Sequence, residues 1–218
     1  MIDMKVISLR KAVEMIPDGA SLMIGGFMGV GTPERLMDEL VRQGKRQLTV
    51  IANDTAKPGC GIGKLITQRS VSTAIVSHIG LNPETQRQML SGEIEVQLVP
   101  QGTLIERIRA GGYGLGGILT PTGVGTEAES GKRKIEVGSH EYLLETPLRA
   151  DFALVDAFLS DYFGNLVYAL TARNFNPVIA MAASTVIADA AHIVPVGLIS
   201  PDHVVTPAAI VDFVVAHE

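Results

Sequence analysis

The fold is decided by one stretch of thirteen residues, SLMIGGFMGVGTP at positions 21–33. Its apolar residues 22–24 predict a short buried strand. Four glycines follow within seven residues, and Thr32 and Pro33 then suit the N-cap and first position of a helix over residues 34–43, which stops at Gly44. We therefore expect a strand, a glycine loop and a helix, with unpaired backbone N–H groups facing a ligand at the positive end of the helix dipole.

The glycine spacing alone does not identify a ligand. Gly26, Gly29 and Gly31 follow the order G-x-x-G-x-G, which is the reverse of the dinucleotide fingerprint, and no Gly-Lys-Ser/Thr follows as a P-loop requires. A tight turn without a ligand and a binding loop both remain open on this pattern.

Composition indicates a protein with much buried surface. At 218 residues the chain is long enough for a full core, its charged fraction is 19% and its mean hydropathy is +0.28. A parallel sheet buried on both faces and a sizeable interface with another chain would together explain these values. The net charge of −5 and the absence of Trp argue against nucleic acid, and the basic triplet 132–134 is interpreted as a solvated turn.

The chain offers no disulfide and no thiolate metal site, because Cys60 is its single cysteine, interpreted as a small free thiol. We predict no metal and no tightly bound cofactor. The first five residues lack the basic and apolar regions of a signal peptide, and the apolar run 178–188 is too short to span a bilayer. A cytoplasmic location and no membrane partner are expected.

Strands and helices alternate along the first half of the chain. This alternation predicts an α/β fold in one domain, 1–218, with an open, mostly parallel sheet covered by helices on both faces. Early strands are expected at 22–24, 48–52, 73–77 and 96–99, and early helices at 9–16, 34–43, 62–67, 83–90 (capped by Asn82) and 104–110. After an irregular glycine-rich run from 111, we expect a small β-hairpin excursion (134–137 with 142–144), strands at 152–155 and 166–168 joined by a turn, a helix at 178–183, and strands at 185–188 and 209–215.

Four separate segments end their strands with residues suited to binding. The loop Gly25–Gly31, Asn53, His78 and Gln101 each come directly after a predicted strand. The carboxyl ends of parallel strands share one edge, where open α/β folds bind ligands, so we expect these segments to converge. Asn53 and Gln101 carry uncharged donors and acceptors that suit a carboxylate or an amide, although ordinary turn chemistry is an alternative for both. His78 is interpreted as a structural residue of this edge.

Several motifs, in order and over almost the whole chain, resemble the alpha subunits of family I CoA-transferases. They are GGFMGVGTP at 25–33, NDT at 53–55, PQGTLIERIRAGG at 100–112, TPTGVGT at 120–126 and ARNF at 172–175. The segments FMG at 27–29 and SHIGLNPET at 77–85 are most similar to the acetate/acetoacetate (butyrate–acetoacetate) type. The resemblance implies a three-layer α/β fold of the CoA-transferase type.

The resemblance also implies an activity and a partner. Family members exchange CoA between an acyl-CoA, here acetyl-, butyryl- or acetoacetyl-CoA, and a free short-chain carboxylate by a ping-pong mechanism. The attacking glutamate lies on the beta subunit, in a Ser-Glu-Asn-Gly segment that this sequence lacks. No catalytic residue is therefore expected here, and an α2β2 assembly is implied. Glu129, Glu34 and Glu106 are interpreted as ordinary surface or helical carboxylates.

The implied site consists of a CoA-binding loop and two residues beside the substrate. The loop residues are Gly25, Gly26, Phe27, Met28, Gly29, Val30 and Gly31, with CoA as a co-substrate, and the neighbours of the substrate are Asn53 and Gln101. The glycines are expected either to meet a phosphate through their N–H groups or to admit the pantetheine arm closely.

Other functions stay open at this stage. Within the family, the alternative is the corresponding chain of a 3-oxoadipate or succinyl-CoA:3-oxoacid CoA-transferase. Outside it, the candidates are a nucleotide-dependent oxidoreductase in which Asp54 holds a ribose and a non-enzymatic sensor of acyl-CoA or sugar phosphates.

Overall fold

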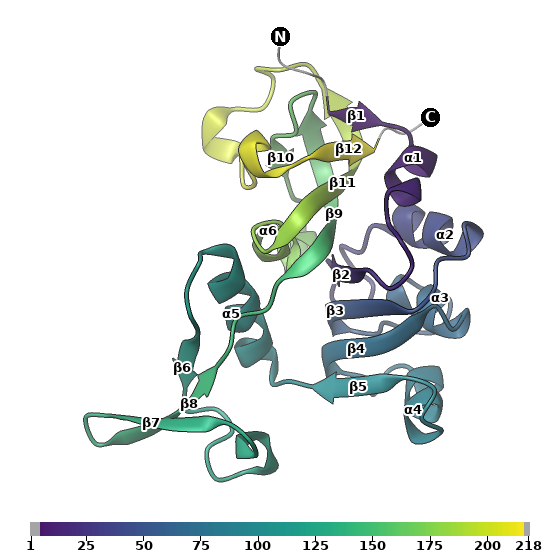
Figure 1. Ribbon diagram of the computed structural model, residues 1–218. Helices are drawn as coiled ribbons and strands as arrows, with labels where there is room; N and C mark the ends of the chain where they lie inside the picture. The colour runs from purple at the N-terminus through teal and green to yellow at the C-terminus, as the bar shows by residue number, and fades with distance from the viewer. Residues whose placement is uncertain (1–4, 216–218) are drawn as a thin grey trace.

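Strands from both ends of the chain meet in one sheet (Figure 1). The computed structural model describes residues 5–215; residues 1–4 and 216–218, which include most of the N-terminal stretch in which no signal peptide is expected, lie outside it. The strands of the main sheet are β1 (Val6–Ile7), β2 (Ser21–Ile24), β3 (Leu48–Asp54), β4 (Val71–His78), β5 (Glu95–Leu98), β9 (Ala150–Asp161), β10 (Leu166–Val167), β11 (Ala183–Val194) and β12 (Phe213–Val215).

The sheet confirms the predicted open, mostly parallel topology. Within the described residues its nine strands run in the order β1-β12-β11-β9-β2-β3-β4-β5, with β10 paired to β9. Each pairing is parallel except that of β10 with β9. Because β1 and β12 pair although they lie at opposite ends of the described chain, we infer a single domain.

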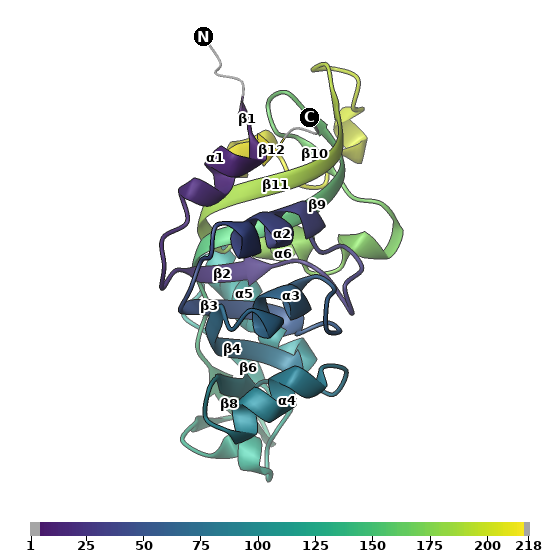
Figure 2. The same ribbon diagram turned by 90° about the vertical axis from the view of Figure 1, so that its right-hand side faces the viewer.

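Helices cover both faces of this sheet, as predicted. They are α1 (Leu9–Glu14), α2 (Glu34–Arg42), α3 (Ile62–Thr67), α4 (Pro83–Leu90), α5 (Gln101–Gly112) and α6 (Asn176–Ile179). Helices α1 to α4 lie on one face, and α5 and α6 lie on the other (Figures 1 and 2). Asn82 caps α4 as predicted, accepting from the N–H groups of Glu84 and Thr85. Within residues 5–215, none of the helices has the length and apolar character needed to cross a membrane.

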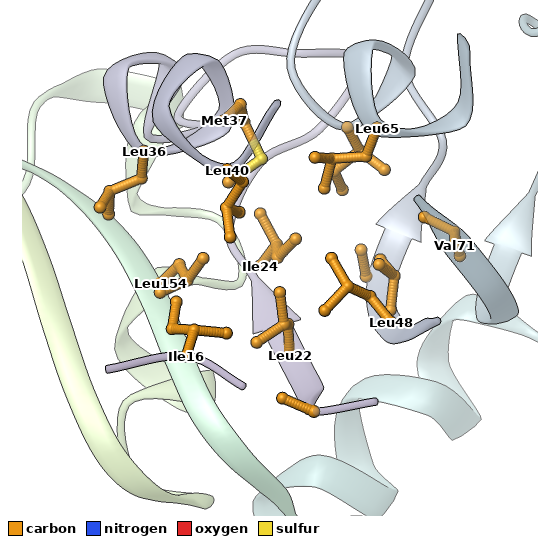
Figure 3. Packing of buried hydrophobic residues seen from close by; sticks show 14 of the residues in the cluster. Ile16, Leu22, Ile24, Leu36, Met37, Leu40, Leu48, Leu65, Val71 and Leu154 are labelled. Carbon is orange, nitrogen blue, oxygen red and sulfur yellow. The ribbon is translucent and has the colours of Figure 1, made fainter. Parts of the chain in front are cut away.

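The central strands are buried on both faces. Along β2, Leu22 and Ile24 face the cluster under α1, α2 and α3, whereas Met23 faces the cluster under α5 and α6. Figure 3 shows Leu22 and Ile24 packed beneath Leu36 and Leu40 of α2. The alternation follows from the pleat of a strand, in which successive side chains point to opposite faces. A continuous apolar run is therefore what a strand covered on both sides requires.

Several predicted elements differ from the structure in their bounds. The strands predicted at 152–155 and 185–188 are the twelve-residue strands β9 and β11. Helix α5 begins at Gln101, three residues before the predicted start, and α6 spans 176–179, not 178–183. The last predicted strand, 209–215, is a 3-10 turn at Ala208–Ile210 followed by β12 alone, because Pro207 directs the chain into that turn. Pro33 and not Thr32 is the N-cap of α2, with no side-chain cap. The buried Thr32 instead packs against the backbone at Gly26 and Gly61.

The predicted hairpin excursion is a small three-stranded antiparallel sheet. Its strands β7 (Arg133–Val137) and β8 (His140–Glu145) form the hairpin, and β6 (Ile118–Thr120), from the glycine-rich run, pairs with β8 on the other side. The triplet 132–134 is not a solvated turn. Lys132 lies 2.6 Å from the buried Glu145, and Lys134 lies 2.8 Å from Glu129, so these charges hold the excursion together.

Two carboxylates face each other across the centre of the sheet. Asp156 of β9 and Asp189 of β11 are register partners, and Arg35 at the start of α2 forms an ion pair with Asp189. Burial, then repulsion from Asp189 and Glu34, raises the pKa of Asp156 to about 6. Ionised Asp156 is therefore a destabilising group at neutral pH.

Replacing Leu154, which is fully buried at the centre of β9, with alanine should lower the free energy of unfolding by about 2–5 kcal/mol, because both its transfer energy and the packing around it are lost. Leu90→Ala is the matched control, since Leu90 is 82% exposed, and should change stability by less than about 0.5 kcal/mol. Urea unfolding at one protein concentration measures both, and equal effects would contradict the assignment of the core.

Asp156→Asn should stabilise the protein at pH 8 and leave it almost unchanged at pH 4. The raised pKa means that the folded state holds a proton that the unfolded state releases, so stability falls as the pH rises from about 4 to about 6. Because Asp156 is partly solvated, we expect the free energy of unfolding of Asp156→Asn at pH 8 to rise by about 1 kcal/mol. Unfolding at a series of pH values measures it, with Asp202→Asn at an exposed site as control. An unchanged pH dependence in Asp156→Asn would refute this account.

Candidate functional site

The glycine loop after β2 is a miniature hairpin. Phe27 and Val30 exchange two backbone hydrogen bonds, of 3.0 and 2.9 Å. Met28 and Gly29 between them have φ angles of +52° and +91°, as in the type I′ turns that close tight hairpins. This turn leaves Phe27, Met28 and Val30 between 42% and 52% exposed, so the loop presents apolar side chains.

Most N–H groups of this loop are already used, which corrects the expectation of an open backbone cradle. Within the described residues, five of the seven N–H groups of 25–31 donate to the protein itself. Those of Gly25, Gly26, Phe27, Met28 and Val30 donate to Leu154, Asn174, Val30, Asp54 and Phe27 respectively. Glu34 also adds a negative charge to the first turn of α2. The loop is therefore poorly suited to a phosphate.

Asp54, at the end of β3, holds the hairpin from one side. Its carboxylate is 5% exposed and accepts from the N–H of Met28 at 2.8 Å and of Ala56 at 2.7 Å. It also accepts from the side-chain amide of Asn53 at 2.7 Å. The interpretation of Asp54 as a ribose ligand is wrong, because these three donors occupy a buried carboxylate.

Two asparagines hold the hairpin from the other side. Asn174 accepts from the N–H of Gly26 at 3.1 Å and donates to the carbonyl of Val30 at 2.9 Å. Asn176 donates to the carbonyl of Gly31 at 2.9 Å. Asn176 also lies against Gly25, where glycine is required because a Cβ would lie 1.8 Å from Oδ1 of Asn176. The hairpin is thus rigidly anchored between two distant parts of the chain.

Beside the hairpin lie the side-chain amides of Asn53 and Gln101 and the hydroxyl of Ser77, which together we call the amide row. Nε2 of Gln101, in the first turn of α5, donates to Oδ1 of Asn53 at 2.9 Å. Oγ of Ser77 lies 2.7 Å from the carbonyl oxygen of Asn53 and 3.3 Å from its Oδ1. The row joins β3, β4 and α5 at the carboxyl edge of the sheet.

The hairpin and the amide row enclose a cavity of about 400 Å³. Its walls include the segments predicted to converge, and they are formed by Phe27, Met28, Asn53, Asp54, Ser77, His78, Leu81 and Gln101. The convergence of 25–31, Asn53, His78 and Gln101 is therefore confirmed as geometry. A volume of this size suits a small-molecule site, and the apolar side chains flank a few fixed polar groups.

A second, larger hollow lies in the excursion. It has a volume of about 650 Å³ and is open to solvent, with glycine, Thr126, Ser130 and charged residues around it. Its charges are already paired. Glu129 binds Lys134 and the N–H of Gly125, which lowers the pKa of Glu129, and Lys132 pairs with Glu145. We place the candidate site in the smaller cavity, where polar groups from three elements converge.

The cavity is equipped to hold a ligand more than to react with it. Asp54 is the only carboxylate among the described residues of its wall, and its oxygens are engaged. Glu34 accepts from the N–H of Gly61 and pairs with Lys64, and Glu106 pairs with Arg109, as expected of helical carboxylates. Within residues 5–215 no cluster of three His, Cys, Asp or Glu side chains is placed to hold a metal ion.

The sequence does not reveal the residues that anchor the site. Its patterns suggest Asp54 only as a ribose ligand and suggest no role for Ser77, Asn174 and Asn176. The available signals are the family motifs NDT, SHIGLNPET and ARNF, which contain Asp54, Ser77 and Asn174 without assigning them a role, and the repeated placement of short polar residues at strand ends. Their partners lie up to 148 residues away in sequence, as for Asn174 and Gly26, and no spacing rule identifies such a pair.

Comparison with known proteins shows the family of this chain. The family model for coenzyme A transferase matches residues 6–217. The chain is 53% identical over 214 residues to the alpha subunit of an acetate CoA-transferase of Escherichia coli (strain K12), covering 98% of this chain and 97% of the relative. It is 47% identical to an acetoacetyl-CoA:acetate/butyrate CoA transferase alpha subunit of Clostridium acetobutylicum, covering 97% of each chain.

A solved structure shares the fold. An acyl-CoA transferase of Escherichia coli O157:H7, described as a thioester complex with CoA, superposes with a TM-score of 0.86 at 24% identity. The match covers 98% of this chain and 47% of that one, so this chain spans about half the length of that relative. With a family match over 6–217 and relatives of nearly equal length at about half identity, this chain belongs to the coenzyme A transferase family, as an alpha subunit.

Proposed function

We propose that this chain is the alpha subunit of a short-chain acyl CoA-transferase, which exchanges CoA between an acyl-CoA and a free carboxylate. The observation that carries this proposal is the 53% identity to the alpha subunit of an acetate CoA-transferase of nearly the same length. The cavity at the carboxyl edge of the sheet supplies a place for the substrates. Acetate, butyrate and acetoacetyl-CoA, which appear in the names of two relatives, are the substrates we propose.

We propose that the hairpin 25–31 contacts the pantetheine arm of CoA. Two alternatives followed from the sequence, a phosphate bound by N–H groups or an arm admitted by glycines. The engaged N–H groups and the exposed side chains of Phe27, Met28 and Val30 favour the arm, which is long and only partly polar. Gly29 adds no side chain at the tip of the hairpin. The space that its Cβ would occupy is open, since nothing lies closer than 4.0 Å to that position.

Asn53 and Gln101 are proposed to bind the carboxylate of the acid or the carbonyl of the thioester. Both are uncharged and neither competes as a base, so they suit an oxygen that gains negative charge during transfer. His78 lines the same cavity and is exposed, but we assign it no chemical role.

The attacking glutamate is proposed to come from a beta subunit, in an α2β2 assembly. The described walls of the cavity contain no carboxylate that is available for attack, because Asp54 is fully engaged. The relative that matches in fold is about twice as long as this chain, which is consistent with a second half carried here by another polypeptide. CoA is then a co-substrate and no tightly bound cofactor is needed. The cytoplasmic location stays a prediction.

The purified chain alone should not exchange CoA between acetate and acetoacetyl-CoA, whereas adding a beta subunit that carries Ser-Glu-Asn-Gly should restore turnover. The reason is that the covalent glutamyl-CoA intermediate requires a nucleophile that this chain does not place in the cavity. Mass spectrometry of the trapped thioester should locate the adduct on the beta subunit. Activity of the lone chain, or an adduct on any of its glutamates, would contradict this division of roles.

Gly29→Ala should raise the KM for acyl-CoA about tenfold or more in the assembled enzyme, because a methyl group would project where the arm passes. Gly92→Ala is the matched control, with a φ of +71° against +91° and no atom within 4 Å of its Cβ position. Both variants incur the same backbone strain of about 1 kcal/mol. Steady-state kinetics measures the change in KM, and thermal unfolding measures the backbone strain. Equal KM values in the two variants would show that the hairpin does not contact CoA.

A further inference from the structure

Asp54 does more in this structure than hold a loop. It is the single acidic group in contact with the amide row, among the residues that the structure describes, and it contacts that row through Asn53. An ionised carboxylate only accepts hydrogen bonds, whereas a side-chain amide carries a donor end and an acceptor end. Asp54 therefore forces Asn53 to turn its NH2 group inward.

The orientation of Asn53 in turn fixes that of Gln101. With Nδ2 of Asn53 directed at Asp54, its Oδ1 faces Gln101 and Ser77, at 2.9 and 3.3 Å. That oxygen needs a donor, so Gln101 turns its own NH2 group toward Asn53. The three side chains thus form a chain of fixed polarity from a buried anion to the cavity wall. Without the carboxylate, the amides of Asn53 and Gln101 could reverse together without losing their mutual bond.

One N–H of Gln101 is left for a ligand. Its Nε2 carries two protons, and within residues 5–215 the bond to Asn53 is the single hydrogen bond that this side chain makes. Gln101 is exposed and lines the cavity. A second donor on Nε2 suits a carboxylate or thioester oxygen, which can only accept.

We propose that Asp54 is a positioning residue for the CoA-transfer reaction, because it fixes the amide polarity of Asn53 and thereby makes Gln101 present an N–H to the oxygen of the substrate. This inference rests on the proposed function, in which Gln101 meets that oxygen. In this proposal Asp54 acts through Asn53 and does not bind the substrate. Its second contact, with the N–H of Met28, concerns the hairpin and predicts a separate effect on CoA.

A double-mutant cycle tests the proposal in the assembled enzyme. Asp54→Asn keeps the shape of the side chain and removes its acceptor-only character. It should lower kcat/KM for the free acid about tenfold or more, and Gln101→Ala should do the same. Because both act through one N–H, the double variant should lie within about threefold of Gln101→Ala alone. Asp151→Asn is the control, since Asp151, like Asp54, accepts hydrogen bonds from a backbone N–H and a side chain, here those of Ser21, at the opposite edge of the sheet.

The outcomes separate the two proposals. If Gln101→Ala leaves kcat/KM for the acid unchanged, Gln101 has no part in the proposed function, whatever Asp54 does. If Gln101→Ala lowers it but the effect of Asp54→Asn is absent, or is fully retained in the double variant, the positioning role is refuted. If the effect of Asp54→Asn is fully retained in the double variant, Asp54 acts through the hairpin, and the change appears in the KM for acyl-CoA.

A second variant tests the polarity even if Asp54→Asn fails to fold. Gln101 is exposed, so Gln101→Glu should fold. With Asn53 locked by Asp54, the introduced carboxylate meets an oxygen and loses the bond to Asn53. The Tm should then lie below that of the unaltered protein, although a carboxylate in the first turn of α5 regains part of the loss through the helix dipole. If Asn53 is free to reverse, it donates to the introduced carboxylate as well, and a Tm above that of the unaltered protein would overturn the proposal.

Discussion

Burial of the central parallel strands on both faces is the constraint on which the position of the site depends. Strands β2, β3 and β9 send alternate side chains into two apolar clusters, so neither face is available to a ligand. Parallel strands also end together at one edge, where the chain must turn into the covering helices. Loops rich in polar residues and glycine gather at this edge, and the cavity beside β2, β3 and β4 lies there.

At that edge the structure favours rigidity over reactivity. The hairpin 25–31 is anchored by Asp54 on one side and by Asn174 and Asn176 on the other, and its close contacts leave no room for a Cβ at Gly25. Such anchoring places a ligand accurately without supplying a nucleophile, since the anchoring groups are themselves hydrogen-bonded. In the function proposed above, recognition and covalent chemistry belong to different polypeptides, and a rigid hairpin fits the first of these two roles.

Local signals in the sequence predicted most elements, because their causes are local. Asn82 followed by Pro83 predicted the start of α4 at the residue where it begins, and the apolar run 22–24 predicted β2. The failures came where distant contacts outweighed local preference. Thr32 has the chemistry of an N-cap, but it packs against Gly26 and Gly61, and Pro33 takes the cap position. The apolar run 209–215 resembles a strand, but Ala208–Ile210 forms a 3-10 turn after Pro207.

By itself, the sequence determined the α/β class, the parallel edge and the segments that meet there, because periodicity and turn residues act over a few positions. It also carried the motifs of the family. Only the tertiary structure decided that the glycine loop is a hairpin with its N–H groups engaged, and that Asp54 is joined to Gln101 through Asn53. The physical reason is that hydrogen-bond partners 48 residues apart, such as Gln101 and Asn53, are chosen by how the strands and helices pack, and no local preference encodes that choice.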